Sequence, residues 1–249
     1  MNICIFDTET TSLDKPFCYN VGYVIADTEN REILVRRSYV VEQIWHNLPL
    51  FQSAYYADKR PLYISAMRAR TTIMDKFGYI CQQMIRDFKA FNIEIAYAYN
   101  SSFDEKVFAF NCDWYKCNNP FDNISVKDIR AFALEYLVKD DYKNFCDKYE
   151  YYTDNGNYST TAETVYRFVF NDTNFIEAHT ALNDSEIEAK ILFACIDAGA
   201  DFNGEYKGRR FVERIQEKEL HIKDRYGDDW YFEYSKIRMN KNKTEITLK

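Results

Sequence analysis

Three strand-like runs open the chain and constrain its fold more than any other feature. They cover residues 2–7, 19–27 and 31–41 and are rich in β-branched and aromatic residues. The segments between them, Asp14-Lys15-Pro16 and Asp27-Thr28-Glu29-Asn30, consist of residues that favour turns. We therefore expect the fold to begin with a β-sheet.

The sequence after these strands is mainly helical in pattern. Residues 93–99 alternate as a fourth strand, and a weak fifth strand is expected around residues 125–127. Helices are expected over 44–57, 72–91, 103–110, 128–138, 141–150, 160–170 and 183–198. Strands first and helices later, with one strand-to-helix crossover near residues 93–110, predict an α/β fold with a mixed sheet flanked by helices.

Composition indicates a soluble globular protein with an acidic main domain. The chain has 249 residues, of which 47% are hydrophobic and 29% charged, and its net charge is −7. This charge argues against non-specific coating of nucleic acid. Residues 201–249 carry more basic than acidic side chains and have their own glycine breaks. We expect residues 1–200 to form the main domain and residues 201–249 a C-terminal appendage.

The cysteines and the N-terminus indicate a cytoplasmic protein. The seven cysteines are an odd number, no CxxC pair occurs, and the nearest pair is Cys112 and Cys117. This pattern predicts a reducing compartment, without a disulfide framework or a zinc site. No apolar run has the length of a membrane span, and no basic start is followed by an apolar core.

Acidic residues occur where the chemistry of a site would need them. Asp7 and Glu9 follow the apolar run 3–6, and alternate residues of a strand share a face. Like charges placed side by side repel unless a cation lies between them. Asp104 falls in the first turn of a helix after the fourth strand, and Asp184 begins a later helix five residues after His179.

The segments DTETTSL, NSSFDEKVF and HTALNDSEIEAKIL together resemble the three motifs of the DEDDh family of 3′→5′ exonucleases. This family includes the proofreading subunit of bacterial replicative DNA polymerase and ribonuclease T. The resemblance spans residues 7–192 in family order. Thr180 disfavours the sister branch, which has Tyr four residues before the last Asp. The family fold is ribonuclease H-like: a mixed five-stranded sheet with helices on both sides.

The resemblance also implies roles for particular residues. Two Mg²⁺ ions, for which Mn²⁺ can substitute, would be held by Asp7, Glu9, Asp104 and Asp184. His179 would be the general base that takes a proton from the attacking water. Substrate contacts would come from the backbone amide of Thr10, the apolar wedge Leu13, and Asn100 near the metal site. Ser12 departs from the family, which usually has Gly there.

A basic and aromatic segment admits two interpretations. Within DKRPLYISAMRAR, the cations Lys59, Arg60, Arg68 and Arg70 interleave with Tyr63 and Met67. The segment could bind a nucleic-acid strand by phosphate contacts and stacking, or it could be an ordinary solvated face.

The residues and the resemblance together predict a metal-dependent enzyme. It would release nucleoside monophosphates from a single-stranded or frayed 3′ end, with DNA favoured over RNA. The alternatives are an RNA-trimming exoribonuclease and a non-catalytic binding module on the same fold. A polymerase or another protein partner could bind residues 201–249.

Overall fold

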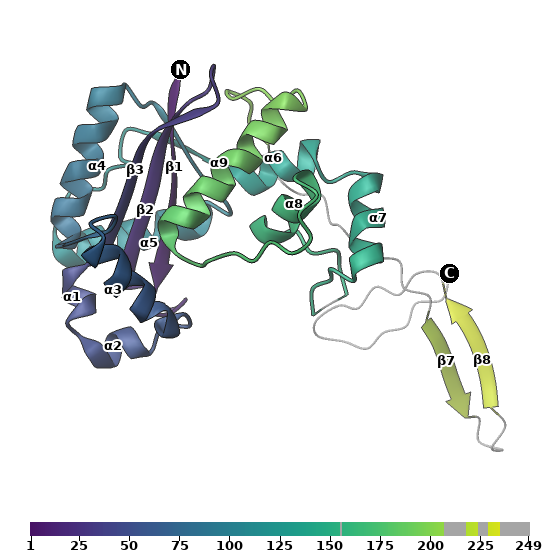
Figure 1. The fold of residues 1–249 in the computed structure, drawn as a ribbon. Coiled ribbons are helices and arrows are strands. Elements are labelled where there is room, and N and C mark those ends of the chain that lie inside the picture. Colours follow the sequence, from purple (N-terminus) through teal and green to yellow (C-terminus); the bar gives the residue numbers. More distant parts are fainter. Residues whose placement is uncertain (155, 207–217, 224–228, 235–249) are drawn as a thin grey trace.

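The computed structural model describes residues 1–206 except 155, together with residues 218–223 and 229–234. Its centre is a six-stranded mixed sheet with the order β4-β3-β2-β1-β5-β6 (Figure 1). The strands are β1 (Asn2–Thr10), β2 (Cys18–Asp27), β3 (Glu32–Val41), β4 (Ile73–Asp75), β5 (Ile95–Ala98) and β6 (Ser125–Asp128). The first three are antiparallel neighbours, whereas β5 runs parallel to β1, β6 to β5, and β4 to β3. The predicted mixed α/β class is confirmed.

The sheet has one strand more than the five predicted, because the stretch 72–91 is not helical throughout. Residues 73–75 form β4, which pairs with residues 39–41 of β3 at the edge of the sheet. Thr72 anchors it by donating from Oγ1 to Ser38 Oγ at 2.9 Å. The backbone of Lys76 is extended, and the helix begins only at Phe77. Three residues are too few for a strand period to show in the sequence.

Nine α-helices complete the described part of the chain. They are α1 (Glu42–Trp45), α2 (Leu48–Gln52), α3 (Arg60–Arg68), α4 (Phe77–Phe91), α5 (Ser102–Tyr115), α6 (Ile129–Tyr136), α7 (Asp140–Tyr149), α8 (Ala162–Val169) and α9 (Ala181–Asp197). The helix expected over 44–57 is two short helices, because Asn47 caps a new helix at Leu48 and proline follows in its first turn. Pro61 likewise lies in the first turn of α3, where its missing N–H costs nothing.

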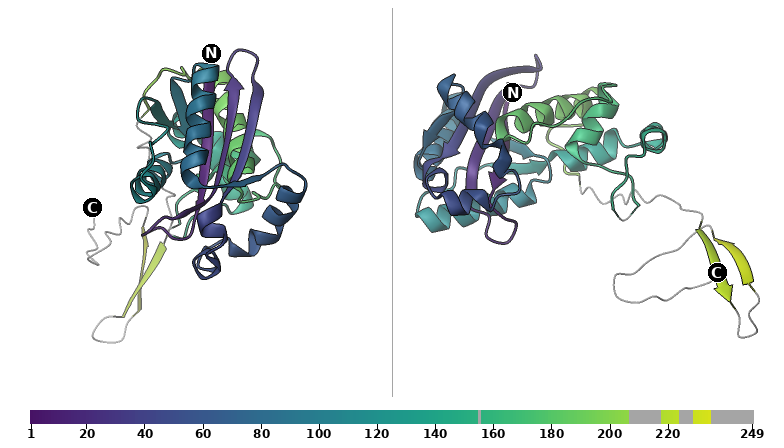
Figure 2. Two further views of the ribbon diagram at one scale, coloured as in Figure 1. Left: turned by 90° about the vertical axis from the view of Figure 1, so that its left-hand side faces the viewer. Right: turned by 60° about the horizontal axis from the view of Figure 1, so that its bottom comes forward.

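Each face of the sheet is covered by its own set of helices (Figures 1 and 2). Helices α4 and α5 cover one face, with Phe77, Met84 and Phe108 fully buried there. Helices α6, α8 and α9 cover the other face, with Phe132 and Ile191 in its core. The sheet is thus the middle layer of three, and β1 and β2 contribute side chains to both cores.

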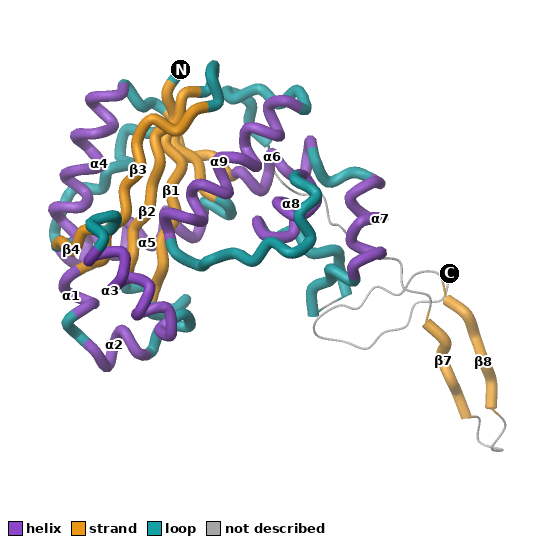
Figure 3. Tube along the Cα trace, viewed as in Figure 1, coloured by secondary structure: helices purple, strands orange, loops and turns teal. Residues whose placement is uncertain are grey.

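Helices α1 to α3 lie at the end of the sheet where β1 finishes (Figure 3). This segment connects β3 to β4, and its aromatic side chains pack on the start of β2. The Tyr19 ring makes edge contacts with Phe51 and Tyr63, at centroid distances of 5.0 and 6.0 Å. The segment therefore borders the end of β1, where the acidic residues lie.

The appendage contains an antiparallel hairpin, β7 (Lys218–Lys223) and β8 (Asp229–Tyr234). The alternation of residues 230–237 in the sequence predicts a short strand, which overlaps β8; residues 235–237 lie outside the described part. Before the hairpin, Phe202 and Tyr206 pack against the α9 core, and Tyr97 donates a hydrogen bond to the Phe202 carbonyl at 2.7 Å. Among the described residues no helix is long and apolar enough to cross a membrane.

Candidate active site

The last residues of β1 carry two of the predicted acidic residues. Ile3 and Ile5 point into the α9 core, and the strand period places Asp7 and Glu9 on the same face. In the register of the sheet, Asp7 faces Gly22 of β2 and Glu9 faces Asn20. Both acids are partly buried. The two carboxylates therefore leave the sheet where α9 begins.

Gly22 allows the start of α9 to lie directly on the sheet. A Cβ atom at Gly22 would stand 2.1 Å from the backbone C of Ala181 and from the backbone N of Leu182. Ser185 fastens the contact by donating from Oγ to the Gly22 carbonyl at 3.1 Å. Because Gly22 is the register partner of Asp7, this close approach brings Asp184 beside Asp7.

Asn20 fixes the first residue of α9. This fully buried side chain accepts the Ala181 N–H at 2.9 Å and the Tyr63 hydroxyl at 3.1 Å on Oδ1. Its Nδ2 donates to the Tyr39 carbonyl at 2.7 Å. Asn20 thus satisfies an N–H that the helix itself leaves unpaired. Neither Gly22 nor Asn20 stands out in the sequence, because no motif contains them.

Asp104 reaches the site from the opposite side of β1. It lies in the first turn of α5, which follows β5, the parallel neighbour of β1. Its side chain is buried, and Thr8 Oγ1 donates to Oδ1 at 2.6 Å. This hydrogen bond and the positive end of the α5 dipole both favour a carboxylate there. Ser101 does not cap the helix with its side chain, but donates to Glu105 at 3.2 Å.

The carboxylates form a crowded and desolvated cluster. Oxygen atoms of Asp7, Glu9 and Asp184 all lie within 4.8 Å of one another. Burial, with repulsion from Glu177 next, raises the pKa of Glu9 to about 8 and that of Asp184 to about 9. Burial raises the pKa of Asp104 to about 7 against the effect of its Thr8 hydrogen bond. The pKa of Asp7 is raised well above its usual range by burial and then by repulsion from Asp104.

Glu188 is a fifth acid that the sequence analysis missed. It lies one helical turn after Asp184 and is buried. Its Oε2 accepts the Tyr99 N–H at 3.2 Å, at the end of β5. Burial and repulsion from Asp104 raise its pKa. The signal for this residue was a charged side chain at helical spacing from Asp184, on a face otherwise filled by Ile187 and Ile191.

His179 lies at the edge of this cluster and is held on two sides. Its ring stacks on Tyr56, with centroids 4.3 Å apart and an interplanar angle of 12°. Its Nδ1 lies 3.7 Å from Glu177 Oε2. Glu163 supports Glu177 by accepting its backbone N–H at 2.7 Å. The backbone φ of His179 is 51°, a left-handed conformation that non-glycine residues rarely adopt. Burial lowers the pKa of His179.

The three predicted substrate-binding residues lie around the ends of β1 and β5. Thr10 is the last residue of β1, next to a bulge, and its Oγ1 donates to the Ser12 carbonyl at 3.3 Å. Leu13 is 83% exposed, so its apolar side chain is available to a ligand. Asn100 is exposed with a φ of 63°, and its N–H donates to Asp128 at 2.8 Å.

The cations of the basic segment 58–70 have different surroundings. The Arg60 guanidinium lies over the Trp45 ring at 4.1 Å, so its role is in packing. The charge of Lys59 instead acts to lower the pKa of Glu9, Asp184 and His179, so this cation lies within electrostatic range of the site. Arg68 is exposed at the end of α3.

The donor set fits hard divalent cations. All the clustered ligand atoms are carboxylate oxygens, the donors that Mg²⁺ and Mn²⁺ prefer. Asp184 Oδ1 is buried and has no hydrogen-bond partner within the described part of the chain. Such an atom needs a cation or a donor to compensate its burial.

Comparisons with known proteins bear on the fold. No family model and no curated protein matches the chain. Among solved structures, the nuclease domain of 3′hExo, a DEDDh family member bound to rAMP, matches with a TM-score of 0.50 at 15% identity, over 80% of this chain and 92% of that one. The chain has the fold of the DEDDh 3′-exonucleases. The predicted ribonuclease H-like architecture is thereby confirmed.

Two further solved structures show the same likeness. A full-length 3′-exonuclease matches with a TM-score of 0.50 at 15% identity, over 96% of this chain and 93% of that one. Apo Exonuclease I matches with a TM-score of 0.50 at 15% identity, over 78% of this chain. This chain spans 41% of Exonuclease I, so that protein has a large part with no counterpart in the match.

Proposed function

We propose that the protein is a two-metal 3′→5′ exonuclease that releases nucleoside monophosphates from single-stranded or frayed 3′ ends. The observation that carries the proposal is the convergence of Asp7, Glu9 and Asp184 within 4.8 Å, on a DEDDh exonuclease fold. Asp104 and His179 complete the set of five residues that the sequence motifs nominate.

The four acids Asp7, Glu9, Asp104 and Asp184 would hold the two ions. Divalent cations at such a site act as Lewis acids on a phosphodiester and generate a nucleophile from water at neutral pH. The protein's own contribution is a rigid frame: Thr8 orients Asp104, and Gly22 and Asn20 set the start of the helix that carries Asp184. Crowding gives the cluster its affinity for cations, because each ion relieves repulsion among the carboxylates.

His179 would accept the proton of the attacking water. Burial lowers the pKa of His179, so the imidazole is neutral and able to accept a proton at pH 7. With Glu177 facing Nδ1, Nε2 is the nitrogen left to act as the base. The Tyr56 stack holds the ring in its plane.

The substrate end would be held around the end of β1. In this proposal the Thr10 amide binds the 3′-hydroxyl, the exposed Leu13 side chain wedges against the last base, and Asn100 lies near the scissile bond. Lys59 supplies a positive charge opposite the acidic cluster, which suits a phosphate contact. A strand end bound this way is read by its hydroxyl and shape rather than by sequence.

DNA is the favoured substrate in this proposal, and RNA is the second candidate. RNA is supported by the likeness to a structure that binds rAMP and to a 3′-exonuclease described with a histone mRNA stem-loop, with a TM-score of 0.50. A few contacts to the 2′-hydroxyl decide between the two substrates.

We further propose a cytoplasmic enzyme whose main domain is residues 1–200, with a protein partner such as a polymerase bound by residues 201–249.

Matched oligonucleotides test this proposal. DNA and RNA of one sequence, each with a 3′-hydroxyl or a 3′-phosphate, are incubated with the full chain and Mg²⁺. We expect mononucleotides from the 3′-hydroxyl strands, faster from DNA, and little product from the 3′-phosphate strands. Equal rates on 3′-hydroxyl and 3′-phosphate strands would contradict the proposed recognition of the 3′-hydroxyl. Binding of the oligonucleotide without any product would favour the non-catalytic binding module.

A further inference from the structure

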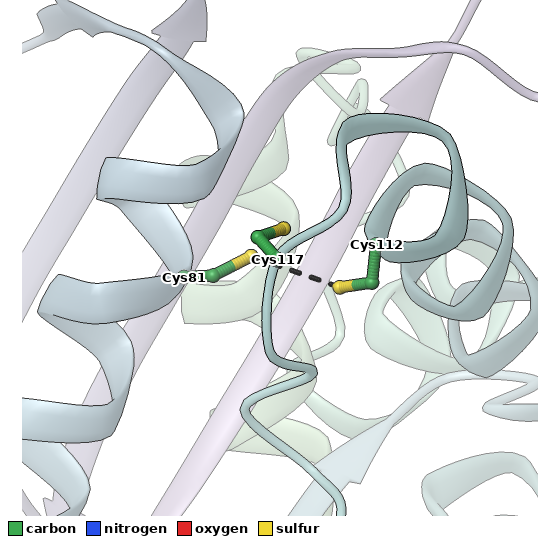
Figure 4. A group of neighbouring side chains, drawn as sticks. All are labelled: Cys81, Cys112 and Cys117. Carbon is green, nitrogen blue, oxygen red and sulfur yellow. Dashed lines mark hydrogen bonds between the residues drawn. The ribbon is translucent and has the colours of Figure 1, made fainter.

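Three cysteines from separate segments meet on the α4/α5 side of the sheet (Figure 4). Cys81 lies on α4, Cys112 near the end of α5, and Cys117 in the loop that follows α5. Their Sγ atoms all lie within 4.8 Å of one another, and those of Cys81 and Cys112 are 3.9 Å apart. Figure 4 shows the Cys81 and Cys112 sulfurs pointing toward each other, with the Cys117 side chain beside them. The cluster is separate from the carboxylates of the proposed active site.

The spacing of the sulfurs suits a shared ion better than a disulfide. Thiolates bound to one zinc ion at about 2.3 Å in a tetrahedron stand roughly 3.8 Å apart, close to the distance between Cys81 and Cys112. A disulfide bond would require about 2.0 Å. No sulfur pair of the cluster is more than 4.8 Å apart, so each lies within about 1 Å of that spacing.

The surroundings provide both a rigid frame and an entrance. Cys81 and Cys112 are buried, whereas Cys117 is partly exposed. Gly78, in the first turn of α4, lies beside Cys117: a Cβ at Gly78 would make an ordinary contact with the Cβ of Cys117 at 3.4 Å. Cys112 Sγ also lies 3.7 Å from the Asn118 carbonyl, to which it donates. No fourth His, Cys, Asp or Glu side chain joins the three sulfurs within the described part of the chain, so solvent near Cys117 would complete a tetrahedron.

We propose that Cys81, Cys112 and Cys117 bind one Zn²⁺ ion as thiolates, with water as the fourth ligand. Soft thiolate donors select zinc over the hard cations that suit the carboxylate cluster. Binding releases protons from the thiols, and the ion ties the end of α5 to α4. Because α5 carries Asp104 at its other end, the zinc site would stiffen a helix of the proposed active site without taking part in its chemistry.

This proposal revises the expectation that the chain has no zinc site. That expectation rested on the absence of a CxxC pair. Cys81 is 31 residues before Cys112, and only the packing of α4 against α5 brings them together. Sequence spacing therefore gave no signal of this cluster.

Cobalt and zinc binding by the reduced, metal-free full chain test the proposal. Co²⁺ should give a sulfur-to-metal charge-transfer band, which the carboxylate cluster cannot produce, and one equivalent of Zn²⁺ should abolish it. Cys117→Ser, a change at a partly exposed position, should lose the band and bind one equivalent of Zn²⁺ less. Cys146 is a buried cysteine outside the cluster, so Cys146→Ser should keep the charge-transfer band and the wild-type number of bound Zn²⁺ ions.

The thermal melt gives a second readout. Zn²⁺ should raise the Tm of the wild type and of Asp7→Asn by a similar amount. The rise in Tm should be smaller in Cys81→Ser and in Cys117→Ser. Absence of the band in a folded wild-type chain, or an unchanged band in Cys117→Ser, would overturn the proposal. Neither result depends on nuclease activity, so failure here is distinct from failure of the proposed exonuclease.

Discussion

The Tyr56 ring lies nearly parallel to the His179 imidazole, with 4.3 Å between their centroids and 12° between their planes. Tyr56 comes from the segment that connects β3 to β4, whereas His179 directly precedes the helix of Asp184. The stack thus joins the α1–α3 segment to the proposed general base. On its other side the imidazole faces Glu177.

Removing the Tyr56 ring should impair His179 without unfolding the protein. An aromatic pair contributes about 0.5–1.5 kcal/mol, so Tyr56→Ala should lower the single-turnover cleavage rate roughly 2- to 10-fold. Tyr56→Phe keeps the ring and should stay near wild type. The rate against pH should shift in Tyr56→Ala alone, because the altered burial changes the pKa of His179. Equal losses in both variants would assign the effect to the hydroxyl rather than to the stack.

Removing His179 should affect the chemical step far more than binding. General-base catalysis supplies about 10²–10⁴-fold, and His179→Ala should lose a comparable factor in rate. Burial lowers the pKa of His179, so the wild-type rate should fall only below the usual histidine range, and that acid limb should flatten in the variant. His46→Ala, at an exposed histidine, is the control. A His179→Ala rate within threefold of wild type would exclude His179 from the mechanism.

The metal-free protein should become less stable as pH rises. The folded pKa values of Asp104 and Asp184, about 7 and about 9, lie above those of an unfolded chain. Their contribution to stability is therefore fully present below about pH 4 and is lost as pH rises through the folded values. Each group adds a slope of at most about 1.4 kcal/mol per pH unit.

Urea unfolding in EDTA from pH 5 to pH 9 measures this slope. Mg²⁺ should restore stability at high pH, and Asp184→Asn should flatten the metal-free profile by removing one titrating group. A metal-free stability that rises over this range would show that the carboxylates do not repel one another.

Placing a side chain at Gly22 should displace α9. The Cβ of Gly22→Ala would overlap the backbone at residues 181 and 182, which cannot move aside as a flexible side chain can. Overpacking a core costs about 1–3 kcal/mol, and we expect the upper end of this range. Activity should fall with stability, because Asp184 moves away from Asp7. Gly78→Ala is the control, since its Cβ meets only ordinary contacts and suits a helix. Equal stability of both variants would contradict the close approach.

The sequence predicted the elements that follow local rules. Periodicity located β1 to β3, α5 and α9, and strand alternation placed the acids at the end of β1 on one face. The edge strand β4 was missed because three residues carry no period, and the 44–57 helix was overextended across Pro49. Asn20 and Gly22 were missed for another reason: their roles depend on where α9 packs on β2, a contact between segments about 160 residues apart. The role of Glu188 likewise depends on a distant contact, with the Tyr99 N–H at the end of β5.

We propose above all that the carboxylate cluster hydrolyses a nucleic-acid strand from its 3′ end with the help of divalent cations. A time course on a 5′-labelled single-stranded oligonucleotide tests it most directly, with wild type, Asp184→Asn, and Glu186→Gln as the control. Glu186 lies on the same helix but pairs with Arg36 on the surface. We expect a ladder that shortens one nucleotide at a time with Mg²⁺, for wild type and Glu186→Gln only, and no ladder in EDTA. A ladder that persists in Asp184→Asn or in EDTA, or cleavage that starts inside the strand, would contradict it.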